Sequence, residues 1–404
     1  MTEAAILAIT GILVLAYLLD NAGRKYGLPS VVMLIGAGIA TRQFLDPTGI
    51  DLGWLDSVVP VLGTIGLILI VLEGALDLTV TRERARLIVV SATSTLMCFA
   101  ASLAAFVALF VAARDMTYTN AVLAAIPFSV ISSAVAIPSA AGLSAEPREF
   151  VVYESSLSDI LGVLVFYSWL GADGSLRDFA IDLVGGGAIS LAVALLAAPA
   201  IFFFINRLEG HVRFLPLVAA IVFLYATGKS MHLSPLVLVL GCGLLLNNPH
   251  LGRWNKRLAA IRAVDYDQTL KEFKDMVAEL TFAAKSFFFL LLGYWTDLST
   301  MHTMHAWAIA GAVCIVVYVS RFAILRLLRQ PYARALTWIA PRGLITVLLF
   351  LAARDAGLLD DFPLGAVMLV VLATSAATAL ARRHAGPAVP EESTPAVALS
   401  EPPD

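Results

Sequence analysis

The sequence is poor in charge and in cysteine, and each shortage excludes a class of protein. Only 14% of its 404 residues are charged and 59% are hydrophobic, whereas about 25% of a typical soluble domain is charged. The basic residues are scattered between apolar runs, which argues against a nucleic-acid partner. Its three cysteines, Cys98, Cys242 and Cys314, lie inside apolar segments and indicate neither a disulfide framework nor a metal-ligand spacing. The composition is that of a membrane protein.

Signals of enzymes and of export are also missing. No nucleophile–base pairing, metal motif or phosphate-binding loop is present, so we expect neither an enzyme nor a cofactor. The start, MTEAAILAITGILVLAYLL, has Glu3 where a signal peptide carries positive charge, and no small-residue cleavage site ends it. We therefore interpret this segment as a retained first membrane helix.

Apolar runs long enough, or nearly long enough, to cross a bilayer recur along the chain. They predict an all-α polytopic membrane protein with about thirteen transmembrane helices. The predicted spans are 4–20, 28–41, 57–76, 87–113, 118–143, 150–171, 179–206, 214–228, 234–247, 275–296, 304–325, 335–353 and 362–381.

The distribution of basic residues predicts how these helices are oriented. Loops on one side carry nineteen Lys and Arg, and loops on the other side carry five. By the positive-inside rule, the N-terminus lies outside the cell membrane and the C-terminus in the cytoplasm. Residues 248–274 are then an amphipathic cytoplasmic loop, and the Pro-, Ala- and Glu-rich tail 382–404 is expected to be disordered.

Several charged residues lie inside the predicted spans, most visibly in ESSLSD at 154–159. A charge at mid-membrane costs about 2.5–3.5 kcal/mol on insertion scales, so such residues face a cavity, pair with each other or carry function. The deep charges are Glu73, Glu154, Asp159, Lys285 and Arg342. Another basic residue, Arg321, lies near the cytoplasmic end of its helix, where we expect it to snorkel to the surface.

Helical spacing separates the roles within ESSLSD. Ser155 and Asp159 are four apart and share a face, whereas Glu154 and Ser158 share another. Glu154 and Asp159 are separated by about 140° around the helix axis and meet different neighbours. We expect one of them to be a paired strut and the other an ion carrier.

Two spans, the fifth and the twelfth, are interrupted. The expected breaks contain Pro127, Ser132, Ser133 and Pro138 in span 118–143, and Pro341 and Gly343 in span 335–353. The two spans run in opposite directions, which predicts an inverted repeat with crossed broken helices: helices 1–6, a linker helix 7, and helices 8–13. Interrupted helices in matching positions indicate a transporter's midplane site, and the acids and bases above are expected to neutralise the half-helix ends.

These motifs resemble the monovalent cation/proton antiporter superfamily, most closely the NhaP-type sodium/proton exchangers. The resemblance covers residues 1–381 and is carried by LEGALDL, ESSLSD, KSFFFLLLG and PRGLITVLLF. It implies homodimers, a dimerisation domain and a six-helix core that moves like an elevator. It also implies that Asp159 binds Na⁺ or K⁺ and H⁺ in turn.

The resemblance assigns roles to the neighbours of Asp159. Ser155 and Ser158 become ligands or supports, and Glu154 pairs with Arg342. Glu73 lies near the site, and Glu73, Ser132 and Ser133 are further candidate ion-binding residues. The sequence departs from the family pattern at Ser158, which replaces Asn, and at Ser132, Ser133 and Ala134, which replace Thr-Asp-Pro. A helix-ten lysine such as Lys285 is typical of electrogenic relatives with paired aspartates. Only one acid occupies the pair position here, which favours electroneutral exchange.

Two other functions remain open at this point. A channel-like potassium efflux protein has the same fold but normally carries a nucleotide-binding domain, and no glycine-rich βαβ pattern is present. A sodium-coupled organic-anion symporter needs a second polar cluster, and none is apparent. The preferred interpretation is a cation/proton antiporter in a lipid membrane, in which cation and proton compete for Asp159.

Overall fold

The computed structural model describes residues 2–26, 29–45, 55–114, 116–172, 174–206, 214–231, 233–251, 266–296 and 298–381, and within these ranges it is helical with no strand. Among the described residues, six helices are long and apolar enough to cross a membrane, and five shorter apolar helices accompany them. The spans predicted from the sequence coincide, to within a few residues, with single helices or with consecutive helices of the structure. The helical form follows from the solvent, because lipid offers no partner to an unpaired backbone group.

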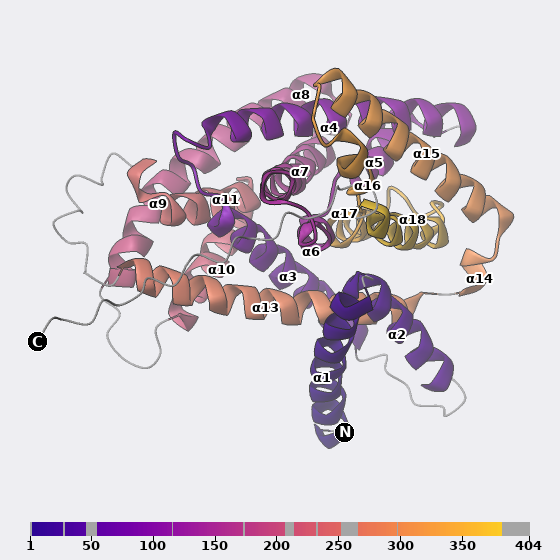
Figure 1. Ribbon diagram of the computed structural model, residues 1–404, viewed down its shortest axis with the longest axis horizontal. Helices are drawn as coiled ribbons and strands as arrows, with labels where there is room; N and C mark the ends of the chain where they lie inside the picture. The colour runs from indigo at the N-terminus through magenta and orange to yellow at the C-terminus, as the bar shows by residue number, and fades with distance from the viewer. Residues whose placement is uncertain are drawn as a thin grey trace, which may run out of the picture.

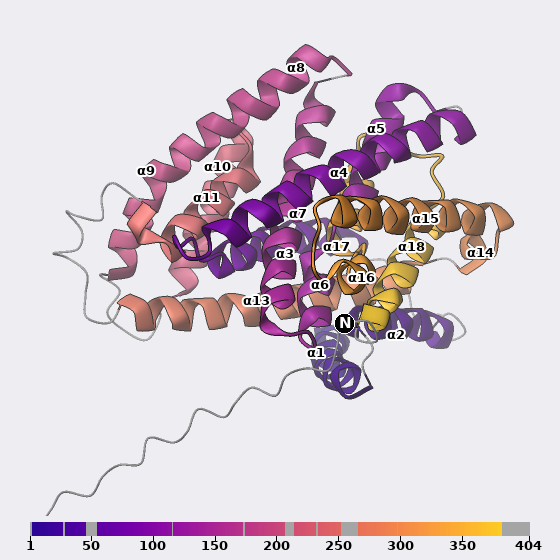
Figure 2. The same cartoon turned by 45° about the horizontal axis from the view of Figure 1, so that its top comes forward.

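The helices form two packed groups, and α7 lies near the centre of the molecule in Figures 1 and 2, in contact with helices of both. The first group comprises α1 (Thr2–Tyr26), α2 (Ser30–Leu45), α3 (Leu55–Asp77), α8 (Leu176–Ile181), the π-helical turn η2 (Asp182–Gly186), α9 (Gly187–Asn206), α10 (Leu215–Ser230), α11 (Pro235–Asn247), η3 (Pro249–Leu251) and α13 (Tyr266–Trp295). The long helix α13 packs on α2 and α3, and α11 packs on α3 and α9.

The second group holds the charged motifs. It comprises α4 (Ala85–Arg114), α5 (Tyr118–Ser129), α6 (Ser133–Ala140), α7 (Ala145–Gly171), α14 (Leu298–Met301), α15 (Met304–Leu327), α16 (Ala333–Trp338), α17 (Leu344–Asp355), α18 (Leu364–Ala377) and η4 (Thr378–Leu380). Within it α4 packs on α5, α7 and α15, and α7 packs on both α5 and α6. The helix α7 also contacts α3 and α11, so it lies where the two groups meet.

The tenth helix begins earlier than the sequence predicted. We expected a loop over 248–274, but α13 begins at Tyr266 and the last nine residues of that segment are helical. Residues 252–265 of the predicted loop and the tail 382–404 lie outside the described residues. The prediction failed because charged residues lower the local hydropathy, whereas the buried residues Tyr266, Leu270 and Phe273 continue one apolar helical face.

The two interrupted helices cross at their breaks, as predicted. The first break runs through residues 130–132 between α5 and α6, and the second through 339–343 between α16 and α17. The backbone N–H of Ser132 donates to the carbonyl of Pro341 over 2.9 Å and joins them. Gly343 permits this approach, because a Cβ at that position would lie 2.7 Å from the Ser132 hydroxyl oxygen.

The first break is not caused by its prolines, contrary to the sequence-based expectation. Pro127 lies inside α5 and Pro138 inside α6. The chain leaves the helix where its amides find other partners: Ile131 N–H donates to the Ser158 hydroxyl over 2.9 Å, and Ser132 N–H donates to Pro341. Membrane helices tolerate internal proline. The Pro127 carbonyl is one of the last carbonyls of α5, which lack helical partners, and it accepts from the Thr346 hydroxyl over 3.0 Å.

Candidate functional site

Asp159 lies on α7 opposite the break between α5 and α6, and its side chain is buried. One carboxylate oxygen, Oδ2, accepts from the backbone N–H of Ser133 over 3.1 Å and also from the Ser133 hydroxyl. Ser133 is the first residue of α6, so the acid meets the positive end of a half-helix. The other oxygen, Oδ1, is buried without a hydrogen-bond partner. In the described part of the chain no basic residue bonds to Asp159.

The serines predicted as ligands are largely engaged elsewhere. The Ser155 hydroxyl donates to the Val151 carbonyl of its own helix over 2.7 Å, and the Ser158 hydroxyl accepts from Ile131 N–H. Ser158 therefore supports the break between α5 and α6. By contrast, the Ser132 hydroxyl is buried and has no partner.

The sequence-based reasoning missed Ser156. Its hydroxyl is also buried without a partner, and it lies against Gly74 of α3. The signal was its spacing, because Ser156 precedes Asp159 by three residues and shares its helix face. Three buried oxygens without partners, on Asp159, Ser132 and Ser156, thus belong to α7 and to the break.

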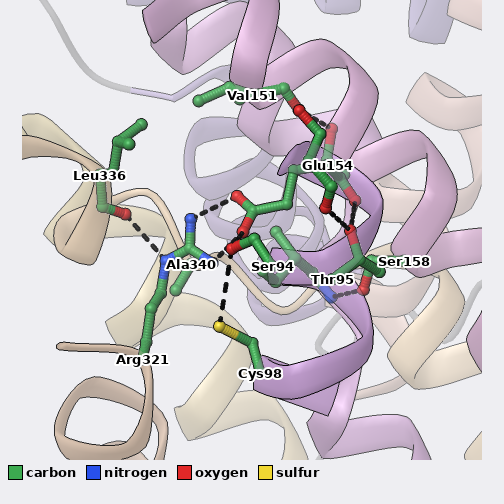
Figure 3. Close-up of polar contacts among 12 residues, drawn as sticks. Ser94, Thr95, Cys98, Val151, Glu154, Ser158, Arg321, Leu336 and Ala340 are labelled. Atoms are coloured by element: carbon green, nitrogen blue, oxygen red, sulfur yellow. Dashed lines mark hydrogen bonds and ion pairs between the residues drawn. The ribbon is translucent and has the colours of Figure 1, made fainter. Parts of the chain in front are cut away.

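Glu154 pairs with Arg321 and not, as predicted, with Arg342 (Figure 3). The guanidinium of Arg321 donates to the two carboxylate oxygens of Glu154, at 3.1 Å to Oε1 and 2.6 Å to Oε2. The Ser94 hydroxyl donates to Oε1 over 2.8 Å. Arg321 is 2% exposed, so the expectation that it snorkels to the surface is wrong as well. Arg321 Nε also donates to the Leu336 carbonyl over 2.8 Å. This bond and the pair with Glu154 keep the Arg321 side chain buried.

Arg342 neutralises a helix end instead of a carboxylate. Its Nε donates to the Phe128 carbonyl over 2.6 Å, and its Nη1 donates to the Ala340 carbonyl over 3.1 Å. Phe128 belongs to the last turn of α5, whose terminal carbonyls lack helical partners and carry negative partial charge. The prediction of a Glu154–Arg342 pair failed because backbone carbonyls, which hydropathy and charge counting ignore, compete for the guanidinium.

Lys285 of α13 forms an ion pair with Glu73 of α3, with 2.9 Å between Nζ and Oε2. The two side chains are 21% and 26% exposed, so this pair is more open than that of Glu154 and Arg321, at 1% and 3%. Gly74, the next residue on α3, faces Ser156. The pair joins α13 to α3, and α3 is a helix of the first group that contacts α7.

A polar face on α4 supports the site and was not singled out from the sequence. Thr95 donates to the backbone carbonyl of Glu154 over 3.1 Å, beside the bond from Ser94. Ser91, Ser94, Thr95, Cys98 and Ser102 are buried at helical spacing in an otherwise apolar helix. That spacing was the available signal, because small polar residues on one face of a membrane helix mark contact with another helix.

Comparison with known proteins identifies the family. A family model described as "Sodium/hydrogen exchanger, transmembrane" matches residues 10–382. The chain belongs to the sodium/hydrogen exchanger family. The family and the fold are those of a cation/proton antiporter and not of an enzyme, as the motifs predicted. No curated protein sequence matches this exchanger at a significant level.

Solved structures match the exchanger over nearly its whole length. A structure of the sodium proton antiporter MjNhaP1 from Methanocaldococcus jannaschii at pH 8 aligns with a TM-score of 0.72 and 20% identity, covering 95% of this chain and 98% of that one. An electron-microscopy structure of the same antiporter aligns with a TM-score of 0.71 and 20% identity, covering 95% and 97%. At this identity the likeness shows the fold.

Proposed function

We propose that the protein exchanges a monovalent cation, Na⁺ or K⁺, for one proton by competition at Asp159. The observation that carries this proposal is the state of its carboxylate. One oxygen is held by α6, the other is buried without a partner, and no basic side chain within the described residues bonds to either. A carboxylate in this setting binds either a proton or a hard cation with oxygen ligands, because both neutralise the same charge.

The surrounding oxygens support cation binding. The unpartnered hydroxyls of Ser132 and Ser156 are neutral oxygen donors of the kind that alkali cations accept. We propose that they contribute to the site together with Asp159. Ser133 and Ser158 would hold the carboxylate and the break in position, and Ser155 would join only if it releases the Val151 carbonyl.

The other deep charges are balanced without Asp159. Glu154 pairs with Arg321, Lys285 pairs with Glu73, and Arg342 lies on the end of α5. Exchange of one cation for one proton at Asp159 leaves those pairs unchanged and moves no net charge across the membrane. This arrangement supports electroneutral exchange.

Alternating access follows from the cost of moving a bare carboxylate through a hydrophobic gate. We propose that α4–α7 and α15–α18 move together as an elevator when Asp159 carries either ligand, and resist movement when it is empty. The crossed breaks support this, because the Ser132–Pro341 hydrogen bond joins the two interrupted helices. The proposal includes a homodimer in the cell membrane, as the family resemblance implies. The N-terminus of each protomer lies outside, as the distribution of basic residues predicts.

Proteoliposomes containing a pH-sensitive dye test the proposal, with Na⁺, K⁺ and Li⁺ added in turn. We expect Asp159→Asn to abolish cation-dependent proton flux and Asp159→Glu to retain part of it. Asp360→Asn, a change of an exposed acid in the loop before α18, is the matched control and should behave like the wild type. Full activity of Asp159→Asn would exclude Asp159 as the carrier. A rate that depends on an imposed membrane potential would exclude electroneutral exchange.

A further inference from the structure

A cavity of about 390 Å³ lies on the side of α7 that faces the first helix group. It extends along α7 from Ile160, the residue after Asp159, to Gly171 at the end of the helix. At 1.5 Å per residue this is a path of about 16 Å. The volume is enough for on the order of ten waters at about 30 Å³ each. The cavity is therefore large enough for a hydrated ion.

The two ends of the cavity differ in character. Near Asp159 its wall is apolar and includes Val71, Ile160 and Val163. At the other end the wall includes the exposed charged residues Asp182 and Lys229. That end lies beside the C-terminus of α7, at the opposite end of the helix from Arg148. By the positive-inside rule it opens to the outside.

Asp182 lies where negative charge is already concentrated. Its Oδ2 is 3.3 Å from the position of a Cβ on Gly171, the last residue of α7. The final carbonyls of a helix lack helical partners and carry negative partial charge. A carboxylate next to that end is unfavourable unless a cation joins it, so this geometry favours a cation.

The backbone departs from the regular α-helix at Asp182. Asp182 is the first residue of a π-helical turn, Asp182–Gly186, inserted between α8 and α9. Turns of this kind are rare and occur frequently at functional sites. Next to the turn, the Ser234 N–H donates to the Ser190 hydroxyl over 2.8 Å and ties the start of α11 to α9. The hydroxyl of Ser234 lies 3.7 Å from the position of a Cβ on Gly186, the last residue of the turn.

The charges of the cavity are not cancelled by direct pairing. Asp182 and Lys229 line the same cavity, but within the described ranges neither side chain forms an ion pair. Asp182 is thus available to a mobile cation, and Lys229 opposes that cation from the same cavity.

We propose that this cavity is an external vestibule in which Asp182 holds a hydrated monovalent cation before it reaches Asp159. The inference rests on the proposed function, since the cation is the one exchanged at Asp159. Asp182 acts as a positioning residue that raises the local cation concentration. Lys229 lowers it, and the apolar wall near Asp159 closes the inner end.

The proposal predicts that substitutions of Asp182 and Lys229 change the KM in opposite directions, and only for cation presented from outside. In sided vesicles, we expect Asp182→Asn to raise the KM for cation presented from outside by about threefold to fivefold, the range expected for a solvated charge. Lys229→Gln should lower that KM, and kcat should stay unchanged in both. The KM for cation presented from the cytoplasmic face should be unaffected. Asp178→Asn, an exposed acid on the neighbouring helix α8 outside the cavity, is the matched control.

A measurement that needs no transport separates this inference from the antiport itself. A Ser234→Cys variant places a thiol on the cavity wall, and its rates of modification by cationic and anionic thiol reagents are compared. Asp182→Asn in this background should reduce the cationic-to-anionic rate ratio severalfold, whereas Asp178→Asn should not. An unchanged ratio, or a KM effect equal from both faces, would overturn the vestibule, even if Asp159→Asn still abolishes exchange.

Discussion

The guanidinium of Arg321 donates hydrogen bonds to both carboxylate oxygens of Glu154, over 3.1 Å and 2.6 Å, and neither side chain is more than 3% exposed. Arg321 comes from α15 and Glu154 from α7, and Arg321 also bonds to Leu336 at the end of α16. The pair therefore connects three helices of the second group. Glu154 lies five residues before Asp159 in the sequence, yet the charges of the pair are neutralised without Asp159.

Removing one partner of this pair should destabilise the exchanger strongly. Glu154→Gln or Arg321→Met leaves an uncompensated charge in the membrane interior, which we expect to cost about 3–5 kcal/mol. The measurement is the thermal unfolding midpoint in detergent, followed by fluorescence-detected size exclusion. The double variant Glu154→Gln/Arg321→Met should recover part of the loss, because neither charge remains.

The same experiment distinguishes Arg321 from Arg342 as the partner. Combining Glu154→Gln with Arg342→Met should produce no recovery, because Arg342 bonds to the carbonyls of Phe128 and Ala340. Recovery with Arg342→Met and none with Arg321→Met would restore the pairing first inferred from the sequence and contradict the observed contacts.

The pair of Lys285 and Glu73 should behave differently from the buried pair. Because it is 21–26% exposed, breaking it with Lys285→Gln should cost at most about 1 kcal/mol of stability. We expect the change to act on transport, since it leaves Glu73 as an uncompensated negative charge on α3, the helix whose next residue, Gly74, contacts Ser156 of α7. The apparent KM for Na⁺ in proteoliposomes should fall.

Glu73→Gln is the reciprocal test. It leaves Lys285 as an uncompensated cation near the site, so the KM for the transported cation should rise. If both substitutions leave the KM unchanged but lower the unfolding midpoint by the same large amount, the pair is a structural strut and takes no part in cation access.

The crossing of the broken helices should not tolerate a side chain at position 343. In Gly343→Ala the new Cβ would lie 2.7 Å from the Ser132 hydroxyl oxygen and 3.0 Å from its Cβ, so the two breaks must separate. We expect a lower unfolding midpoint and reduced exchange. Gly311→Ala on α15 has nothing within 4 Å of its new Cβ and should be neutral or slightly stabilising.

A compensating change tests whether the contact with Ser132 is the cause. Gly343→Ala combined with Ser132→Gly removes the two closest atoms and leaves only Val135 Cγ2, at 3.1 Å, so the unfolding midpoint should partly return. No recovery would show that the glycine is required for another reason.

Much of the architecture could be predicted because it follows from the bilayer. Apolar length placed the helices, and the breaks at Ser132 and Pro341 were visible as polar or proline residues in apolar runs. The start of α13 was not visible to hydropathy, because charged residues alternate with the buried face of Tyr266, Leu270 and Phe273. Amphipathic segments carry their signal in periodicity and not in mean hydropathy.

The partners of the charged residues were harder to predict than their positions. The deep acids and bases were expected to neutralise half-helix ends, and the structure places Asp159 against Ser133, the first residue of α6. The choice between Arg321 and Arg342 for Glu154 depended on backbone carbonyls that only the tertiary structure exposes. The position of Arg321 near a helix end in the sequence also suggested that its side chain reaches the surface. It does not, because the buried Glu154 carboxylate binds the guanidinium.

The hydrogen bond between Ser132 and Pro341 also makes the crossing a potential optical reporter. Pro341 lies three residues after Trp338, whose ring is tilted by 45° against that of Tyr318 with 5.2 Å between the centroids. We expect a rearrangement of residues 131–133 on loading of Asp159 to reach this indole through that bond. The emission of Trp338, with the chain's other five tryptophans replaced by phenylalanine, would then register occupancy directly, without a gradient or an added dye.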